Sequence, residues 1–199
     1  RKKYLDQKIN QEIKEDIEAS ASQVGYGRIH LEEDWGKIKK LSKPLSYNEK
    51  FALETKEIHQ FLFHHLTWTK EEQMEKRVGM GVGTLELNFP ASLIFKLLRF
   101  WPVMNLLNKL FGASNLVAQE NERIFNHSAM IGTIISKSDS PEDMVMTGRL
   151  LQRIWLKSTK HNLAMQLLTG IGFFHFKVKH GDPEPFNQKQ VTLIEESYN

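Results

Sequence analysis

Cysteine is absent from this sequence of 199 residues. The chain can therefore form no disulfide, no thiolate metal site and no cysteine nucleophile, and it gives no sign of secretion. An excess of one charge is also lacking, because 27 Lys and Arg face 24 Asp and Glu, which leaves a net charge of +3. A balance this close to zero does not by itself predict binding to nucleic acid.

Uninterrupted hydrophobic runs are lacking as well, and no signal peptide is visible. The most apolar segment, residues 89–111, is interrupted by Lys96, Arg99, Pro102 and Lys109, which exclude a membrane span. There is neither a G-x-S-x-G elbow nor a P-loop. The overall composition is typical of a soluble globular protein, and we expect a cytoplasmic location. The first residue is an arginine rather than an initiator methionine, so we expect a piece of a longer polypeptide.

The segment from Asp139 to Gly170 has the clearest helical signal in the chain. Ser140 can cap a helix whose first position is Pro141, and Asp143 completes a Ser-x-x-Asp capping box. Apolar residues then occupy more than one narrow stripe, which predicts a helix that is buried on most sides, Trp155 included. A glycine in the helix interior, Gly148, suggests close approach of another backbone or a ligand. Asn162 is the expected stop.

The rest of the chain reads as a mostly helical α+β pattern. The spacing of apolar residues predicts helices over residues 9–22, 34–41, 48–66, 118–125 and, with breaks, 90–111. Pro44 is expected to break the pattern, and Gly25 and Gly27 to end the first helix. Strands are predicted at residues 28–32, 130–136 and 171–178, the last two buried. The glycines at 79, 81 and 83 predict a flexible loop, and a loop and a short amphipathic stretch should follow Gly181.

Several motifs occur in the order known from one family. Residues 147–156 read small-residue-Gly-Arg, an apolar pair and Arg-x-Trp-Leu; Asn-Leu-Ala-x-Gln and Leu-Thr-Gly follow at 162–170. Earlier pieces are Arg-Lys-Lys-Tyr at 1–4, Leu-Thr-Trp-Thr-Lys-Glu-Glu at 66–72 and Gly-Thr-Leu-Glu-Leu at 83–87. Together these resemble the C-terminal half of FMN-dependent nitroreductase-like proteins, most closely divergent members fused to adenylating (ThiF-like) domains.

The resemblance implies an α+β fold with a small mixed central sheet surrounded by helices, in a domain of residues 1–180 followed by a tail, 181–199. It implies a cytoplasmic homodimer that uses reduced nicotinamide, NAD(P)H, and FMN to reduce an unknown small-molecule acceptor. The flavin carries the chemistry in such enzymes, so no catalytic acid or base is expected. By resemblance the cofactor-binding residues are Arg1, Lys2 and Lys3 at the phosphate, and Gly79, Met80, Gly81, Leu168, Thr169 and Gly170 near the ring.

The chain also departs from this family. Classical members carry a Pro, an Asn and a Trp after the first helix to hold the ribityl chain and ring, and residues 19–29 contain none of them. The family's Asp-Gly is replaced by Val78-Gly79 and Met80-Gly81. The alternative function is therefore a non-catalytic nitroreductase-like module that serves dimerisation or the docking of a fused or partner enzyme.

Three further features bear on possible binding sites or interfaces. His59, His64 and His65 are spaced by five and six rather than by three or four residues, which predicts no metal site. Arg149, Arg153, Lys157 and Lys160 share a helical face that could bind phosphate or simply be solvated. The apolar segment 89–111 could lie in a membrane interface, or cover a pocket or pack on a partner subunit. Its apolar surface, with that of 141–161, predicts a homodimer.

Overall fold

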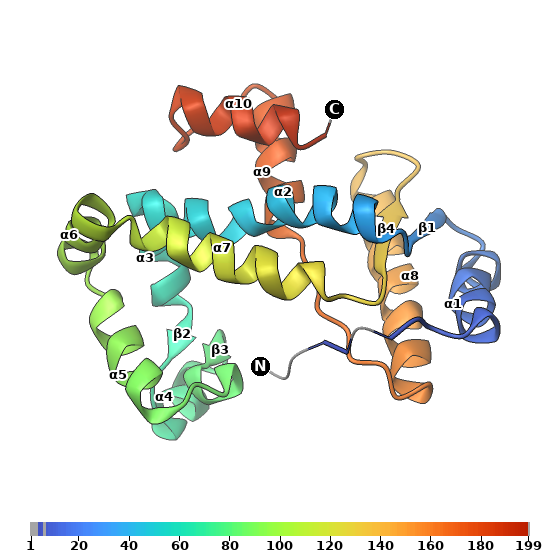
Figure 1. Ribbon diagram of the computed structural model, residues 1–199, viewed down its shortest axis with the longest axis horizontal. Helices are drawn as coiled ribbons and strands as arrows, with labels where there is room; N and C mark the ends of the chain where they lie inside the picture. The colour runs from blue at the N-terminus through green and yellow to red at the C-terminus, as the bar shows by residue number, and fades with distance from the viewer. Residues whose placement is uncertain (1–3, 6, 199) are drawn as a thin grey trace. The chain divides into compact units, whose positions relative to one another are not determined.

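The computed structural model describes residues 4, 5 and 7–198 of the chain (Figure 1). Arg1, Lys2 and Lys3 lie outside the described residues, and so does the prediction that they bind a phosphate. The described residues divide into two compact units. Unit 1 contains Ser42–Arg123 and the chain from Thr169 onward, and unit 2 contains Tyr4–Leu41 and Ile124–Leu168.

Unit 2 is built around a two-stranded antiparallel sheet. Strand β1 (Arg28–Glu32) pairs with β4 (Ile131–Ile135), in a register that places Arg28 opposite Ile135 and Glu32 opposite Ile131. Helices α1 (Gln11–Val24) and α8 (Pro141–Lys160) contact each other, and each also contacts one of these strands (Figure 1). The apolar core of this unit centres on Ile17, Leu150 and Ile154.

Local sequence accounts for the ends of α1. The side chain of Asn10 accepts a hydrogen bond from the backbone N–H of Glu12 at 3.0 Å, which satisfies one of the free donors at the helix start. Gly25 ends the helix at φ 69°, a left-handed conformation that costs glycine little. The predicted helix over 9–22, its glycine stop and the strand at 28–32 are thus confirmed within a few residues.

Unit 1 consists mainly of helices. Its elements are α3 (Lys56–His64), β2 (Leu66–Thr67), α4 (Lys70–Lys76), β3 (Met80–Gly81), a 3₁₀ turn (Val82–Leu85), α5 (Phe89–Leu98), α6 (Trp101–Phe111), α9 (Gly170–Lys179) and α10 (Gln188–Glu196). The strands β2 and β3 form a short parallel pair. Helices α2 (Trp35–Glu54) and α7 (Ala113–Asn126) each contribute residues to both units.

Two apolar clusters hold unit 1 together. One joins the end of α2 to α9 and α10 through Phe51, Ile171, Phe186 and Ile194. The other joins α2, α3 and α6 through Leu53, Phe63, Leu66 and Met104. The chain after Gly181, predicted as a tail, therefore contains a helix whose Ile194 is fully buried in the first cluster.

The predicted α+β class is confirmed at the level of a mostly helical chain with small sheets, but two details of the sheet prediction are wrong. The described strands form two separate pairs rather than one central sheet. Residues 171–178 form most of helix α9 instead of a strand, since Ile171, Phe174 and Val178 recur at helical spacing toward Phe51 and Phe186. The strand predicted at 130–136 is present as β4, but it is only half-buried at best.

Two helix predictions need correction in α2 and α3. Helix α2 runs through Pro44 rather than ending before it. The helix predicted over 48–66 is interrupted at Thr55, the N-cap residue of α3, which has an extended backbone at φ −106° and ψ 117°. A proline removes one backbone hydrogen bond from a helix interior. The residues that follow it on α2, Leu45, Tyr47 and Phe51, pack in the cluster with α9 and α10.

The start and stop of α8 agree with the sequence, but its burial does not. The Ser140 hydroxyl accepts a hydrogen bond from the Asp143 backbone N–H, and Asn162 follows the helix at φ 56°. The helix is not buried on most sides, because Trp155 is 43% exposed. Among the described elements, the most extensive contacts of α8 are with α1 and β4, and its buried Leu150 and Ile154 enter the unit 2 core.

Candidate functional site

The glycine-spaced segment is held against strand β2 by its backbone. The Met80 N–H donates to the carbonyl oxygen of His65 at 2.9 Å, and Met80 pairs with Leu66 in the parallel ladder. Gly79 has φ 93°, and a Cβ atom there would lie 2.3 Å from the His65 carbonyl oxygen. A Cβ on Gly81 would lie 3.0 Å from the side-chain oxygen of Gln73. These glycines therefore serve a close approach of chain segments, so residues 79–83 are not a flexible loop throughout.

The second predicted flavin segment, Leu168–Thr169–Gly170, leads into α9. Thr169 is the N-cap residue, and its side chain makes no capping hydrogen bond. A Cβ on Gly170 would overlap the side-chain oxygen of Asn48, at 1.3 Å. The side chain of Asn48, from α2, thus occupies the space beside this glycine. Gly170 lies against Asn48 of α2, whereas Gly79 lies against His65 and Gly81 against Gln73 of α4, so these contacts do not bring the two segments to one site.

The three histidines differ in their burial and in their contacts. His59 is fully buried, with its Nε2 at 2.8 Å from the Leu98 carbonyl oxygen and its ring beside Phe63 and Trp101. Burial lowers the pKa of His59, so the ring is neutral and its Nε2–H donates to that carbonyl. Its buried Nδ1 has no partner among the described residues. His64 and His65 are exposed. Within the described part of the chain, no group of His, Asp or Glu could hold a metal ion.

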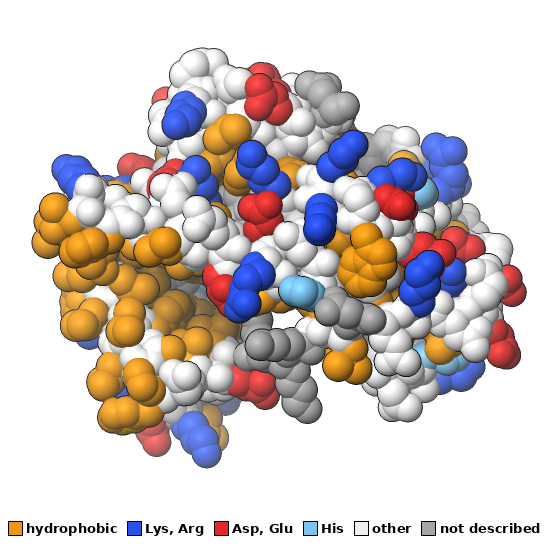
Figure 2. Space-filling view, in the orientation of Figure 1, with side chains coloured by type: hydrophobic (Ala, Val, Ile, Leu, Met, Phe, Trp, Pro, Cys, Tyr) orange, Lys and Arg blue, Asp and Glu red, His pale blue; other side chains and the backbone are white. Residues whose placement is uncertain are grey.

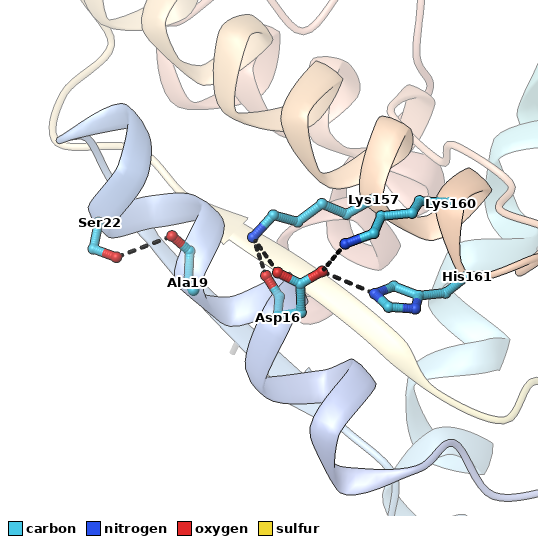
Figure 3. Close-up of polar contacts among 6 residues, drawn as sticks. All are labelled: Asp16, Ala19, Ser22, Lys157, Lys160 and His161. Carbon is cyan, nitrogen blue, oxygen red and sulfur yellow. Dashed lines mark hydrogen bonds and ion pairs between the residues drawn. The ribbon is translucent and has the colours of Figure 1, made fainter.

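A cluster of charged groups joins α1 to the end of α8 (Figure 3). The Asp16 carboxylate oxygens lie 2.9 Å from the Lys157 ammonium nitrogen and 2.8 Å from His161 Nε2. The Lys160 ammonium nitrogen lies 3.7 Å from the same carboxylate. The Lys157 ammonium also donates to the backbone carbonyl of Asp16. The hydrogen bonds from Lys157 and His161 lower the pKa of Asp16 to about 2. This carboxylate is therefore ionised at neutral pH, and its oxygens are already bonded to Lys157 and His161. These contacts favour a structural link between α1 and α8 over a role as a general base.

The same cluster changes the interpretation of the basic stripe. Lys157 is buried and bound to Asp16, so it is not part of a solvated or phosphate-binding face. Arg149 and Arg153 are exposed, as the solvated alternative predicts. Sequence spacing predicts that these cations share one face of the helix, but it cannot show that Asp16 of α1 forms an ion pair with Lys157.

The side of α8 opposite Lys157 is open and apolar. At 100° per residue, Gly148 points away from Lys157, and the positions around Gly148 on the helical wheel are Met144, Val145, Leu151, Gln152 and Trp155. A Cβ on Gly148 would meet nothing within 4 Å, so the close approach predicted from this glycine does not occur among the described residues. The surface there forms an open depression of about 370 Å³ lined by Gly148, Leu151, Gln152, Trp155 and Leu156. We call the surface formed by these residues the α8 open face: Met144, Val145, Gly148, Leu151, Gln152, Trp155 and Leu156.

No family model, curated protein or solved structure significantly matches this chain. Of the helices in the described residues, none combines the length and the apolar content that crossing a bilayer requires.

Proposed function

We propose that this chain is a non-catalytic association module of the nitroreductase-like type, which pairs with a second copy of itself through the α8 open face. The observation that carries the proposal is the apolar stripe on that face, with Trp155 43% and Leu156 60% exposed to solvent. A stripe of large apolar side chains on a helix is normally covered, and a contiguous exposed one marks an interaction site.

Gly148 favours a second helix as the occupant. A glycine without neighbours lets another helix backbone approach closely, and it lies at the middle of the stripe. In an antiparallel pair that crosses at Gly148, Val145 of each copy would face Leu151 of the other. Large apolar side chains would then meet on both sides of the crossing point, which is the self-complementary arrangement that a two-fold interface requires.

Charge has little part in this contact. Arg153 and Glu142 lie about 140° and about 120° from Gly148 on the helical wheel, on the side of Lys157, so they do not face the partner. Arg149, at about 100°, lies at one edge of the face, where its two copies would approach each other near the two-fold. Apolar contact therefore supplies the affinity.

The size of the face sets the expected strength. Its exposed large side chains offer on the order of 400 Å² per copy, given that a large aromatic buries roughly 150–250 Å². The two copies together would bury on the order of 800 Å², less than the roughly 1,200 Å² of stable specific interfaces, so we expect weak self-association in the micromolar range. The experiment is sedimentation velocity over a concentration series of the full chain, in which a monomer at all concentrations up to about 100 μM contradicts the proposal.

Variants sharpen this test. Gly148→Ala improves helix propensity by about 1 kcal/mol, so it should raise the stability of the monomer while it weakens the dimer by blocking the close approach. Lys39→Gln, at an exposed position of α2, is the control and should leave association unchanged.

An FMN-dependent oxidoreductase that uses NAD(P)H is the second proposal, carried by the sequence resemblance. One structural observation favours it: the first backbone N–H groups of α9 have no acceptor from the Thr169 side chain and could bind an anion or a ring oxygen. The described residues do not otherwise fit the cofactor, because Asn48 occupies the space beside Gly170. Titration of FMN fluorescence with the protein tests it, and sub-micromolar affinity would favour the enzyme over the module.

A further inference from the structure

The helices α5 and α6 each have one side packed into unit 1. Phe95 of α5 lies against Phe63 and Trp68, with ring centroids 5.2 and 5.9 Å apart. On α6, Met104 is fully buried in the same cluster, and Trp101 packs against it. His59 bonds the carbonyl of Leu98 at 2.8 Å, where α5 ends. Both helices are therefore firmly attached to the fold.

The other sides of these two helices are apolar and uncovered. Side chains exposed between 48% and 78% are Phe89, Leu93, Ile94, Leu97, Phe100, Leu106, Leu110 and Phe111. Figure 2 shows hydrophobic side chains gathered over α5 and α6, at the left of the view. We call these eight residues the α5–α6 surface.

The extent of the α5–α6 surface is unusual for a protein face that meets only water. With roughly 150–250 Å² for each large aromatic side chain, the eight residues expose on the order of 800 Å². The largest apolar patch of a monomeric protein is typically about 300–600 Å² and is itself often functional. A contiguous apolar patch of this size normally marks a site that is covered by a partner or a membrane, so this surface needs an apolar neighbour.

The charged side chains on α5 and α6 themselves are all of one sign. From Leu87 through Gln119 the sequence contains Lys96, Arg99 and Lys109 but no Asp or Glu. All three cations are exposed, and the Arg99 guanidinium lies 4.6 Å from the ring centre of Phe100. Two copies of this surface placed face to face would bring like charges together without a compensating carboxylate on either of these helices. A layer that is apolar inside and negative at its edge would instead match both features.

We infer that the α5–α6 surface docks on the face of a lipid bilayer that carries anionic headgroups, with the two helices lying in the interface. The exposed Phe and Leu side chains enter the boundary between headgroups and acyl chains. Lys96, Arg99 and Lys109 remain at the level of the headgroup phosphates, with their aliphatic stems against the apolar layer. Pairing through the α8 open face is a separate property of unit 2, and the inference does not depend on it.

The test is co-sedimentation of the full chain with vesicles of phosphatidylcholine, with and without about 30% phosphatidylserine. We expect binding to the anionic vesicles, weaker binding to the neutral ones, and loss of the difference as NaCl rises from 50 to 500 mM. Each cation near an anionic surface contributes about fivefold to the partition coefficient. The variant Lys96→Gln/Lys109→Gln should therefore bind anionic vesicles about 25-fold more weakly.

The matched control is Lys39→Gln/Lys40→Gln, which removes the same charge from exposed positions of α2 and should bind as the unchanged chain does. A second variant, Phe89→Ser/Phe111→Ser, should lose binding to both kinds of vesicle. The inference is overturned if the chain fails to sediment with anionic vesicles at 50 mM NaCl, or if both lysine variants lose binding equally. It is also overturned if the Phe89 and Phe111 changes abolish self-association in solution instead, which would assign the surface to a second copy.

Discussion

Alanine substitutions of two leucines on opposite sides of α8 should have very different effects. Leu150 is fully buried in the unit 2 core, between Ile17 and Ile154, and its Cδ2 lies 3.1 Å from where a Cβ on Gly27 would be. Leu156 is 60% exposed on the α8 open face. Both changes remove the same atoms and place the same good helix former at the site, so helix propensity cancels in the comparison.

The expected magnitudes follow from burial. A fully enclosed leucine costs about 2–5 kcal/mol when it is replaced by alanine, and we expect about 4 kcal/mol at Leu150 because its neighbours come from two helices and the sheet. Burying a whole leucine is worth roughly 1.5–3 kcal/mol, and Leu156 has less than half of its surface buried. Leu156→Ala should therefore cost about 1 kcal/mol or less.

The assay is urea unfolding followed by far-ultraviolet circular dichroism at low and high protein concentration. If a second copy covers the α8 open face, the loss caused by Leu156→Ala should grow with protein concentration, because association stabilises the folded chain. The loss caused by Leu150→Ala should not depend on concentration. Equal losses for both variants at every concentration would place Leu156 in the core and refute the assignment of an open face.

Three further predictions concern charge and backbone. Because hydrogen bonds from Lys157 and then His161 lower the pKa of Asp16 from 3.8 to about 2, its stabilising effect is present above about pH 4 and is lost as the pH falls toward 2. Asp16→Asn should reduce the dependence of the urea unfolding midpoint on pH across that range. Burial lowers the pKa of His59 below 6.5, so the unfolded chain binds its proton first and stability should fall as the pH drops below 6.5. His59→Leu should remove this slope, and a slope that persists would assign it elsewhere. Gly79→Ala should cost about 2 kcal/mol or more, since φ is 93° and its Cβ would lie 2.3 Å from a carbonyl oxygen; Gly83→Ala, with open space, is the control.

Sequence patterns predicted the elements whose stabilising signals are local. The four-residue spacing of Ile9, Ile13 and Ile17 and the cap at Ser140 each depend on neighbours in the chain, and the helices α1 and α8 begin and end close to the expected residues. The alternation at residues 28–32 likewise matches β1. Where spacing and caps agree, the short-range interactions decide the structure.

Other features depend on long-range contacts that no local pattern contains. Residues 171–178 are rich in aromatic and β-branched side chains, which favour a strand, but packing of Ile171 and Phe174 against Phe51 selects a helix. The burial of α8 was overestimated because apolar content does not say which residues find a neighbour. The local sequence likewise favours a solvent-exposed Lys157, because Asp16, the residue that binds it, lies 141 residues away in the chain.

The link between Asp16 and Lys157 has a consequence for the synthesis of the chain. Unit 2 is assembled from residues 4–41 and 124–168, so α1 leaves the ribosome long before its partner α8 exists. A separation of 141 residues at about 5–20 residues per second means a delay of roughly 7–30 s. During this time the apolar side of α1, with Ile13 and Ile17, has no completed core to enter. The nascent chain should therefore expose that side to chaperones until α8 has been made.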